Sequence, residues 1–250
     1  MNHLKLRTLF ALYLSLQVLS LATPPRVGAE EHTHLNPIEA QLVFNEAFEP
    51  TEGERPNTRG GGARPGLLKC QGDREVIETL VPKQRYGLTF EERPSIFVNL
   101  PETTAREVWL SFKDENGDFF ETAILPIAQK SGIVRFSWPD RLPPLETGNT
   151  YKWTLAVVCG ENLDPDDPLF TGYVTRIDRT ANIEQELAQK TAIEQAKWYA
   201  DRGYWYDLLL TIVRARQEQP DNPNLKTLWE SLLSSVGLEN IASQPLGAIE

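Results

Sequence analysis

Cys70 and Cys159 constrain the fold more than any other feature, because the chain of 250 residues contains no other cysteine. Each cysteine ends a stretch in which apolar residues take every second position, "GLLKC" and "YKWTLAVVC". Such alternation places these side chains on one face of a β-strand, so both sulfurs are expected to point into a sheet interior. A metal site of the CxxC type is excluded by the number and spacing of the cysteines.

The first 29 residues have the features of a secretory signal peptide. Lys5 and Arg7 precede an apolar run, Pro24 and Pro25 interrupt it, and "VGA" (27–29) suits a signal peptidase. The run is shorter than the roughly 20 residues that span a bilayer, and no later stretch is apolar enough to do so. We therefore expect an exported protein, in the periplasm, the thylakoid lumen or the extracellular space, without a membrane span after cleavage.

Export decides how the cysteines are interpreted. Outside the reducing cytosol an even number of cysteines predicts a disulfide, with two buried free thiols as the alternative. Closing a loop of about 90 residues would stabilise the fold by roughly 4–5 kcal/mol in the chain-entropy model.

The charge excludes one class of partner. Removing 1–29 takes away three basic and no acidic residues, which lowers the formal charge from −10 to −13. A chain this acidic repels phosphate backbones, and no basic stripe compensates, so we expect no nucleic-acid partner.

Composition and periodicity divide the rest of the chain into three parts. Residues 30–66 are rich in Glu, Asn, Pro and Gly, which predicts a flexible linker. Residues 67–178 contain about seven short strands separated by turns, including Asn116-Gly117 in a tight hairpin, which favours an antiparallel β-sandwich. Residues 179–250 have helical periodicity and predict a helical segment packed on the sandwich. The fold class is therefore α+β.

Three helices are expected in the helical segment. The first should run from Asn182, in a capping box with Gln185, to about Asp201. The second should run from about Tyr204 to Gln217, and the third carries an apolar stripe from Leu225 to Val236. The hairpin resembles a tetratricopeptide unit, although Leu208 stands where that family prefers alanine. Since such repeats need roughly three units to stand alone, this one must lean on the sandwich.

Aromatic residues cluster between the first two helices. We expect them mainly to pack the helix elbow, with a ligand cage as the minor alternative. As a possible partner surface the cluster supplies Tyr199, Tyr204, Trp205 and Tyr206.

Catalytic residues are hard to find. His3 falls in the signal peptide, and His32 and His34 lie in the linker, so no histidine remains for a nucleophile-activating pair in the folded region. Asp164, Asp166 and Asp167 could bind Ca²⁺, but acidic residues are ordinary in turns. We therefore predict no enzyme activity, no catalytic residue, no cofactor and no metal.

Several phrases together resemble a known family. "ERPSIFVNLP", "PLETGNTYKWTLAVVC", "YADRGYWYDLL" and "LLSSVGLENIASQPL" are similar, in order, to blocks of the cyanobacterial family called domain of unknown function 928. The resemblance covers about residues 58–246 and implies a cyanobacterial exported protein. It implies no reaction, ligand or catalytic residue.

These observations favour a non-catalytic binding or adaptor module of the cell envelope, with another envelope protein as partner. One alternative is a carbohydrate-binding or carbohydrate-active protein that uses the acidic loops and exposed tryptophans such as Trp109. A second alternative is a structural envelope component.

Overall fold

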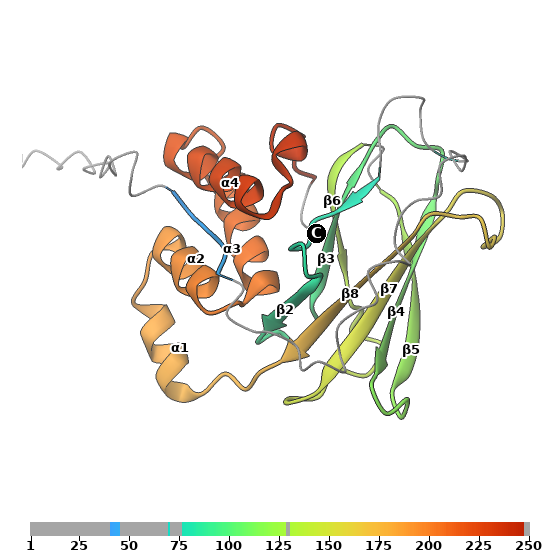
Figure 1. Cartoon of the computed structure of the whole chain (residues 1–250), viewed down its shortest axis with the longest axis horizontal. Helices are drawn as coiled ribbons and strands as arrows, with labels where there is room; N and C mark the ends of the chain where they lie inside the picture. Colours follow the sequence, from blue (N-terminus) through green and yellow to red (C-terminus); the bar gives the residue numbers. More distant parts are fainter. Residues whose placement is uncertain (1–40, 46–69, 71–76, 129–130, 248–250) are drawn as a thin grey trace, which may run out of the picture. The chain divides into compact units, whose positions relative to one another are not determined.

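The computed structural model describes residues 41–45, 70, 77–128 and 131–247. The predicted signal peptide, 1–29, and most of the predicted linker, 30–66, lie outside these residues. The described part contains two β-sheets followed by four α-helices, in chain order (Figure 1). The α+β class is therefore confirmed. None of the described helices is long and apolar enough to cross a membrane.

The larger sheet has five strands in the order β2-β8-β7-β4-β5. Their bounds are β2 Tyr86–Thr89, β8 Leu169–Arg176, β7 Thr150–Val158, β4 Glu107–Asp114 and β5 Phe120–Pro126. The hairpin between β4 and β5 turns at Gly117, whose φ of +77° is one that residues with a side chain rarely adopt. The hairpin predicted at Asn116-Gly117 is thus confirmed, although residues 115–119 form a longer loop than a two-residue turn.

The smaller sheet has the order β1-β3-β6, with β1 Glu78–Thr79, β3 Ser95–Leu100 and β6 Gly132–Ser137. The two sheets form a sandwich-like arrangement around a continuous apolar core. Phe112 of the larger sheet meets Trp138, just after β6, edge to face at 4.8 Å between ring centroids.

Among the eight described strands, pairing is antiparallel with one exception. β2 runs parallel to β8, with Tyr86 opposite Tyr173, so the prediction of a purely antiparallel sandwich is wrong at this edge. Side chains alternate between the two faces of a strand in parallel and in antiparallel sheets alike. The alternation of apolar residues therefore could not reveal that β2 runs parallel to its neighbour.

Four α-helices replace the three that the sequence predicts. The expected first helix is two, α1 Ala181–Ala188 and α2 Ala192–Asp201, and α3 Trp205–Glu218 and α4 Pro223–Val236 follow. The interruption falls at Thr191, whose hydroxyl accepts from the Glu194 backbone N–H while the Glu194 carboxylate accepts from the Thr191 N–H. The box predicted at Asn182 is wrong, because Thr180 caps α1.

The helices pack on the inner face of the larger sheet beside β2. A Cβ on Gly87 would come within 2.6 Å of the Trp205 Cβ, so only glycine allows α3 to approach this strand so closely. Leu88 N–H donates to Gly203 O at 2.9 Å, and Trp205 Nε1 donates to Leu80 O at 2.9 Å. The tetratricopeptide resemblance of this hairpin stays a prediction.

Residues 41–45 belong to the predicted linker, but they pack against the helices. Leu42 and Phe44 are buried, and the N–H groups of these two residues donate to the hydroxyls of Ser231 and Ser235 at 2.9 and 3.2 Å. Two residues of extended chain rise by about 6.6 Å, close to the rise of about 6 Å over four helical residues. The spacing of the two serines therefore suits an extended segment.

Candidate functional site

The aromatic cluster proposed as a partner surface is buried. Tyr199, Tyr204, Trp205 and Tyr206 are all at most 7% exposed. Phe90, just after β2, stacks on Tyr204 with ring centroids 4.2 Å apart. The cluster thus fills the contact between the helices and the sheet. It does not form an exposed surface, because the apolar faces of α2 and α3 need the sheet as cover.

A buried carboxylate, which the sequence analysis did not single out, lies beside this cluster. Asp207, in the first turn of α3, is 4% exposed, and its two oxygens accept from the Phe90 N–H at 3.4 and 3.1 Å. Burial, and then the charge of Glu91, raise the pKa of Asp207 to about 7, although hydrogen bonds from Thr89 and Phe90 oppose the shift. Asp207 links the end of β2 to α3.

Asp207 also affects its aromatic neighbours. Burial, followed by the charge of Asp207, raises the pKa of Tyr199 to about 12, and the same two causes raise the pKa of Tyr204. The hydroxyl of Tyr199 accepts a hydrogen bond from Arg179 at 2.9 Å. The Asp207 carboxylate and the Tyr199 hydroxyl thus both have structural partners, which favours a packing role over chemistry.

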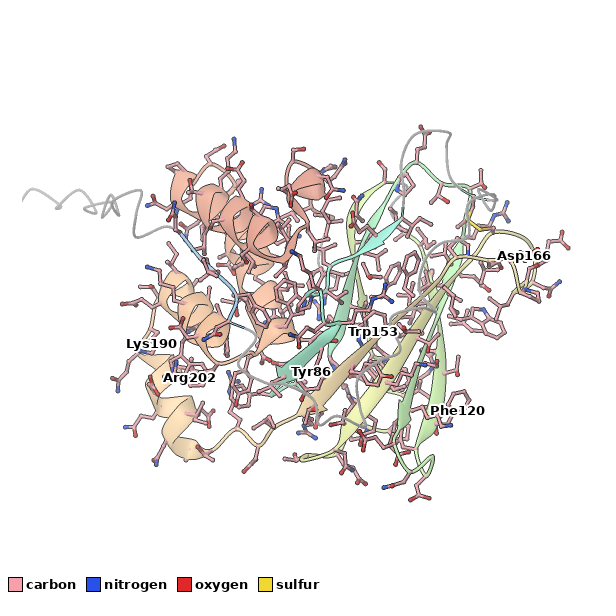
Figure 2. The ribbon with its side chains drawn as sticks, viewed as in Figure 1. Tyr86, Phe120, Trp153, Asp166, Lys190 and Arg202 are labelled. Carbon is pink, nitrogen blue, oxygen red and sulfur yellow. A yellow bond between two sulfur atoms is a disulfide. The ribbon has the colours of Figure 1, made fainter. Side chains whose placement is uncertain are left out.

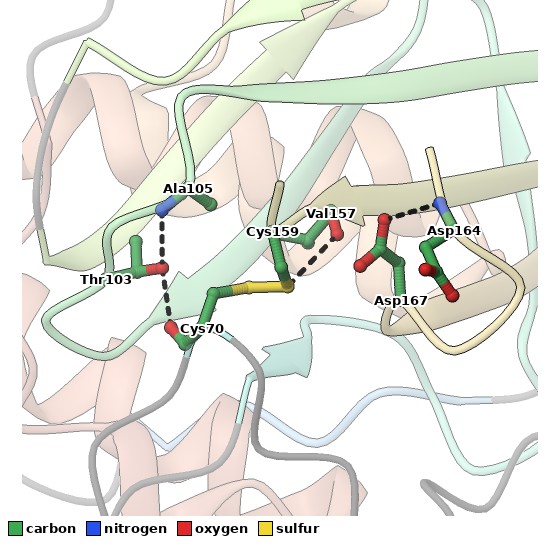
Figure 3. The surroundings of a disulfide bond; sticks show 7 residues. All are labelled: Cys70, Thr103, Ala105, Val157, Cys159, Asp164 and Asp167. Carbon is green, nitrogen blue, oxygen red and sulfur yellow. Dashed lines mark hydrogen bonds between the residues drawn. A yellow bond between two sulfur atoms is a disulfide. The ribbon is translucent and has the colours of Figure 1, made fainter. Parts of the chain in front are cut away.

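The predicted disulfide is present between Cys70 and Cys159, with the Cα atoms 5.1 Å apart (Figure 3). Cys159 follows directly after β7. The Thr103 hydroxyl donates to the Cys70 carbonyl at 2.7 Å and accepts from the Ala105 N–H at 3.1 Å. The bond therefore ties the chain before β1 to the end of the longest strand of the larger sheet.

The three calcium candidates lie in the loop after Cys159. The Asp167 carboxylate accepts from the Asp164 N–H at 2.9 Å, and the Asp164 carboxylate accepts from the Asp166 N–H at 2.9 Å. Asp166 is exposed at the outer end of the loop (Figure 2). In the described ranges no three acidic, histidine or cysteine side chains are grouped to hold a metal ion. The carboxylates instead shape their own loop.

The outer face of the larger sheet carries an organised set of side chains, most of which are exposed or partly exposed. Strand register places them in three rows that cross β5, β4, β7 and β8 in this order. An apolar row contains Ile124, Trp109, Ala156 and Leu169; a hydroxyl row contains Thr122, Ser111, Thr154 and Thr171; a third row contains Phe120, Lys113, Lys152 and Tyr173. Rows lie about 6.8 Å apart and strands about 4.8 Å apart.

Large apolar side chains on this face are unusually exposed. Phe120, Ile124 and Leu169 are 63%, 49% and 54% exposed, and these are three of the five large exposed hydrophobic residues of the described chain. Figure 2 shows Phe120 on β5, at the edge of the larger sheet. Large apolar side chains that are exposed together on one face of a sheet are candidates for an interaction surface.

The centre of the apolar row is Trp109, which is partly buried. Its indole N–H donates to the Glu107 carboxylate at 3.1 Å, two residues earlier on the same strand face. This bond requires the ring to lean along the strand. Ala156 lies directly opposite Trp109 in the register and is only 4% exposed, although it is on the outer face.

The third row brings two like charges together. Lys113 and Lys152 are directly opposite each other on neighbouring antiparallel strands, and both are exposed. Like charges in such a pair are destabilising. The pair is also unexpected in a chain with ten more acidic than basic residues. We call the twelve residues of the three rows the outer-face site.

Comparison with known proteins agrees with the resemblance noted from the sequence. The family model for the Domain of Unknown Function DUF928 matches residues 59–246. The chain belongs to the DUF928 family. No curated protein matches the DUF928 chain. Among solved structures, the fn3 domain of human collagen alpha-1(XX) chain is similar at 14% identity, over 44% of this chain and 88% of that domain. Its TM-score of 0.29 carries no argument about the DUF928 fold.

Sequence reasoning found only part of the outer-face site in this DUF928 protein. The alternation in "EVWLSF" indicated that Trp109 points away from the core. The neighbours of Trp109 come from β5, β7 and β8, up to about 60 positions away, and only the strand register could identify them.

Proposed function

We propose that this DUF928 protein is an exported, non-catalytic binding module of the cell envelope that binds another envelope protein through the outer-face site. Two exposed apolar side chains in the row of Trp109, Ile124 and Leu169, with Phe120 exposed on the same face, are the observation that carries the proposal. Burial of the helical aromatic cluster leaves this sheet face as the better candidate surface.

Export is supported by two features. The N-terminal 29 residues have the pattern of a signal peptide, and the Cys70–Cys159 disulfide is typical of proteins outside the reducing cytosol. The family resemblance adds a cyanobacterial origin, with the periplasm or the thylakoid lumen as the compartment. In this proposal the tetratricopeptide-like hairpin braces the sheet, and partner binding is left to the outer-face site.

A protein partner suits the chemistry of the surface. Ile124 and Leu169 are aliphatic, and buried aliphatic and aromatic side chains form the centres of protein–protein interfaces. The hydroxyl row can hydrogen-bond a partner backbone, and Lys113 with Lys152 favours acidic groups at the rim. The partner surface should therefore be apolar with an acidic margin.

Photo-crosslinking tests this proposal. A photoreactive amino acid replaces Ile124 or Leu169 in the producing cells. The matched control replaces Val43, which is also apolar and is 69% exposed, but belongs to the segment 41–45, whose Leu42 and Phe44 bond to α4. We expect one adduct of defined mass from the two sheet positions and none from position 43. The adduct should disappear in the Trp109→Ala background. Equal adducts from all three positions, or none from the sheet, would contradict the proposal.

A carbohydrate ligand is the second candidate. The partly exposed ring of Trp109, next to a row of four hydroxyl side chains, is the observation that favours it. Glycan-array binding that is lost in Trp109→Ala and kept in Ile124→Ser would favour a sugar, because sugars stack on aromatic rings and not on aliphatic side chains. If the protein binds no glycan on the array, the carbohydrate proposal is rejected and the protein partner remains.

A further inference from the structure

Among the edge strands of the two described sheets, β5 differs from β1, β2 and β6. β1 has two residues and β2 has four, and the Leu88 N–H of β2 donates to Gly203 O at 2.9 Å. The C-terminal residues bond to β6 at Ile133, with two backbone bonds of 2.8 Å. β5 has seven residues, Phe120–Pro126, and pairs only with β4 among the described strands, at the side of the larger sheet away from the helices (Figure 1). β5 is therefore the long open edge of the described chain.

The free backbone groups of β5 can be assigned from the strand register. The Asp114 N–H donates to Phe119 O at 3.1 Å, and the Ile127 N–H donates to Arg106 O at 2.8 Å. Both pairs continue the register of β4 with β5. In an antiparallel pair, positions that bond to the neighbour alternate with positions whose N–H and C=O point away from it. The backbone groups of β5 that point away from β4 are therefore those of Phe120, Thr122 and Ile124.

β5 lacks the usual protection of an edge strand. Natural edges are guarded by lysines, prolines, bulges or short length. The register of β4 with β5 is unbroken, so β5 has no bulge; it contains no lysine, and its proline, Pro126, is the last residue. Phe120 and Ile124, whose backbone groups point outward, also have side chains that are 63% and 49% exposed. An edge of this kind is a template for pairing with another strand.

The outward residues of β5 match a second copy of the same strand. When Thr122 of one copy is set opposite Thr122 of the other in antiparallel orientation, Phe120 of each copy lies opposite Ile124 of the other. Directly opposite residues of an antiparallel pair have side chains on the same face, and aromatic–β-branched pairs are favourable there. Both pairs consist of side chains that solvent otherwise surrounds. The two-fold pairing thus gives two apolar contacts on the outer face.

The inner face suits the same pairing. Phe119 of each copy lies opposite Leu125 of the other, and both side chains are partly buried against the core. Glu121, the single charged residue of β5, lies opposite Ala123 of the second copy. No two like charges are directly opposite each other, so the register avoids the contact that most destabilises strand pairs.

We propose that β5 pairs antiparallel with β5 of a second copy of this chain, about a two-fold axis at Thr122. The N–H and C=O groups of the three outward residues then bond to those of the second copy, and the larger sheet continues across both copies. Isologous contacts of this kind close after two copies. The outer faces of the two copies lie on the same side of the joined sheet. Because the pairing uses backbone groups at the sheet edge, it goes beyond the proposed function and does not depend on it.

Sedimentation of the purified protein over a range of concentrations tests the pairing. We expect a reversible dimer that dissociates on dilution, because one strand pair is a small interface. Thr122→Pro removes an N–H that the fold itself does not use, and it should weaken dimerisation at least about tenfold. Leu169→Lys, which alters the outer-face site on β8, should leave dimerisation unchanged, so failure of this proposal and failure of the proposed function are distinguishable.

Charge exchange tests the register and does not rely on Thr122→Pro being folded. One variant carries Phe120→Lys and Ile124→Lys, and a second carries Phe120→Glu and Ile124→Glu; both positions are exposed, so both variants should fold. Like charges directly opposite each other should keep each variant monomeric where the wild type is dimeric. An equal mixture of the two should dimerise, because each lysine then faces a glutamate.

Amide hydrogen exchange gives a second readout of the same register. As the protein concentration rises, exchange at the N–H groups of Phe120, Thr122 and Ile124 should slow, whereas exchange at Ala123, which already bonds to β4, should not change. A wild type that stays monomeric at every concentration, an assembly larger than two copies, or variants that fail to associate when mixed would overturn the proposal.

Discussion

The indole N–H of Trp153 donates to the hydroxyl of Tyr206 at 2.7 Å, and this bond joins the larger sheet to α3 inside the protein. The Tyr206 hydroxyl in turn donates to the Tyr173 carbonyl at 2.9 Å on the next strand. Figure 2 shows Trp153 among the strands of the larger sheet. Both rings are buried, so no water replaces either partner. The chain of bonds makes the sheet and the helices one structural unit.

Tyr206→Phe tests this unit. The ring stays, but a buried donor and a buried acceptor each lose a partner, which destabilises the fold by about 1–3 kcal/mol. Urea unfolding followed by tryptophan fluorescence and by helical circular dichroism should show one coincident transition at a lower midpoint. Tyr173→Phe is the matched control, because Tyr173 contributes to this contact only through its backbone carbonyl. This substitution should change stability less.

The disulfide contributes mainly by restricting the unfolded chain. The Cys70→Ser/Cys159→Ser double variant should lose roughly 4–5 kcal/mol of unfolding free energy, because the closed loop is about 90 residues long. Chemical denaturation in oxidising buffer measures this loss. Adding reductant should shift the wild type toward the variant and should leave the variant unchanged; a wild type that is insensitive to reductant would contradict the expectation.

Asp207 makes stability depend on pH. Its pKa of about 7 lies above the ordinary 3.8, so the folded state binds more protons than the unfolded state between these values. The stability due to this proton is therefore fully present below about pH 4 and is lost as pH rises through about 7. Glu91, Thr89, Phe90 and Arg179 surround the group and are unchanged in Asp207→Asn.

Denaturation midpoints measured from pH 4 to pH 8 test the role of Asp207. The free energy of unfolding of the wild type should fall across this range as the Asp207 carboxyl group releases its proton. Asp207→Asn should show a smaller change with pH. The Asn side chain can still accept from the Phe90 N–H, so the variant should fold. Identical slopes for the two proteins would show that Asp207 does not carry the effect.

The segment 41–45 anchors the helices. Phe44 meets Trp205 edge to face, with ring centroids 4.8 Å apart, and is buried, whereas its neighbour Val43 is 69% exposed. Phe44→Ala should cost about 3–5 kcal/mol, as is typical of a buried aromatic residue, and should increase hydrogen exchange in α3 and α4. Val43→Ala is the control and should change neither measurement; equal effects of the two substitutions would argue against docking of the segment.

Several features could be predicted from the sequence because their physical cause is local. The even number of cysteines in a chain expected to be exported predicted the disulfide, Asn116-Gly117 predicted the hairpin between β4 and β5, and Leu225 to Val236 form the buried stripe of α4. The break between α1 and α2 at Thr191 also has a local cause. A Thr-x-x-Glu capping box was present in the sequence, but the apolar periodicity on either side concealed it.

Other features depend on residues that only the folded chain brings together. The parallel pairing of β2 with β8, the burial of Asp207 against Phe90 and the rows around Trp109 each join segments that are distant in sequence. Periodicity tells which way a side chain points, but it carries no information on which strand lies beside it. Neighbours, and with them burial, pKa and exposed surface, were decided by tertiary packing, because those properties depend on what surrounds a group in space.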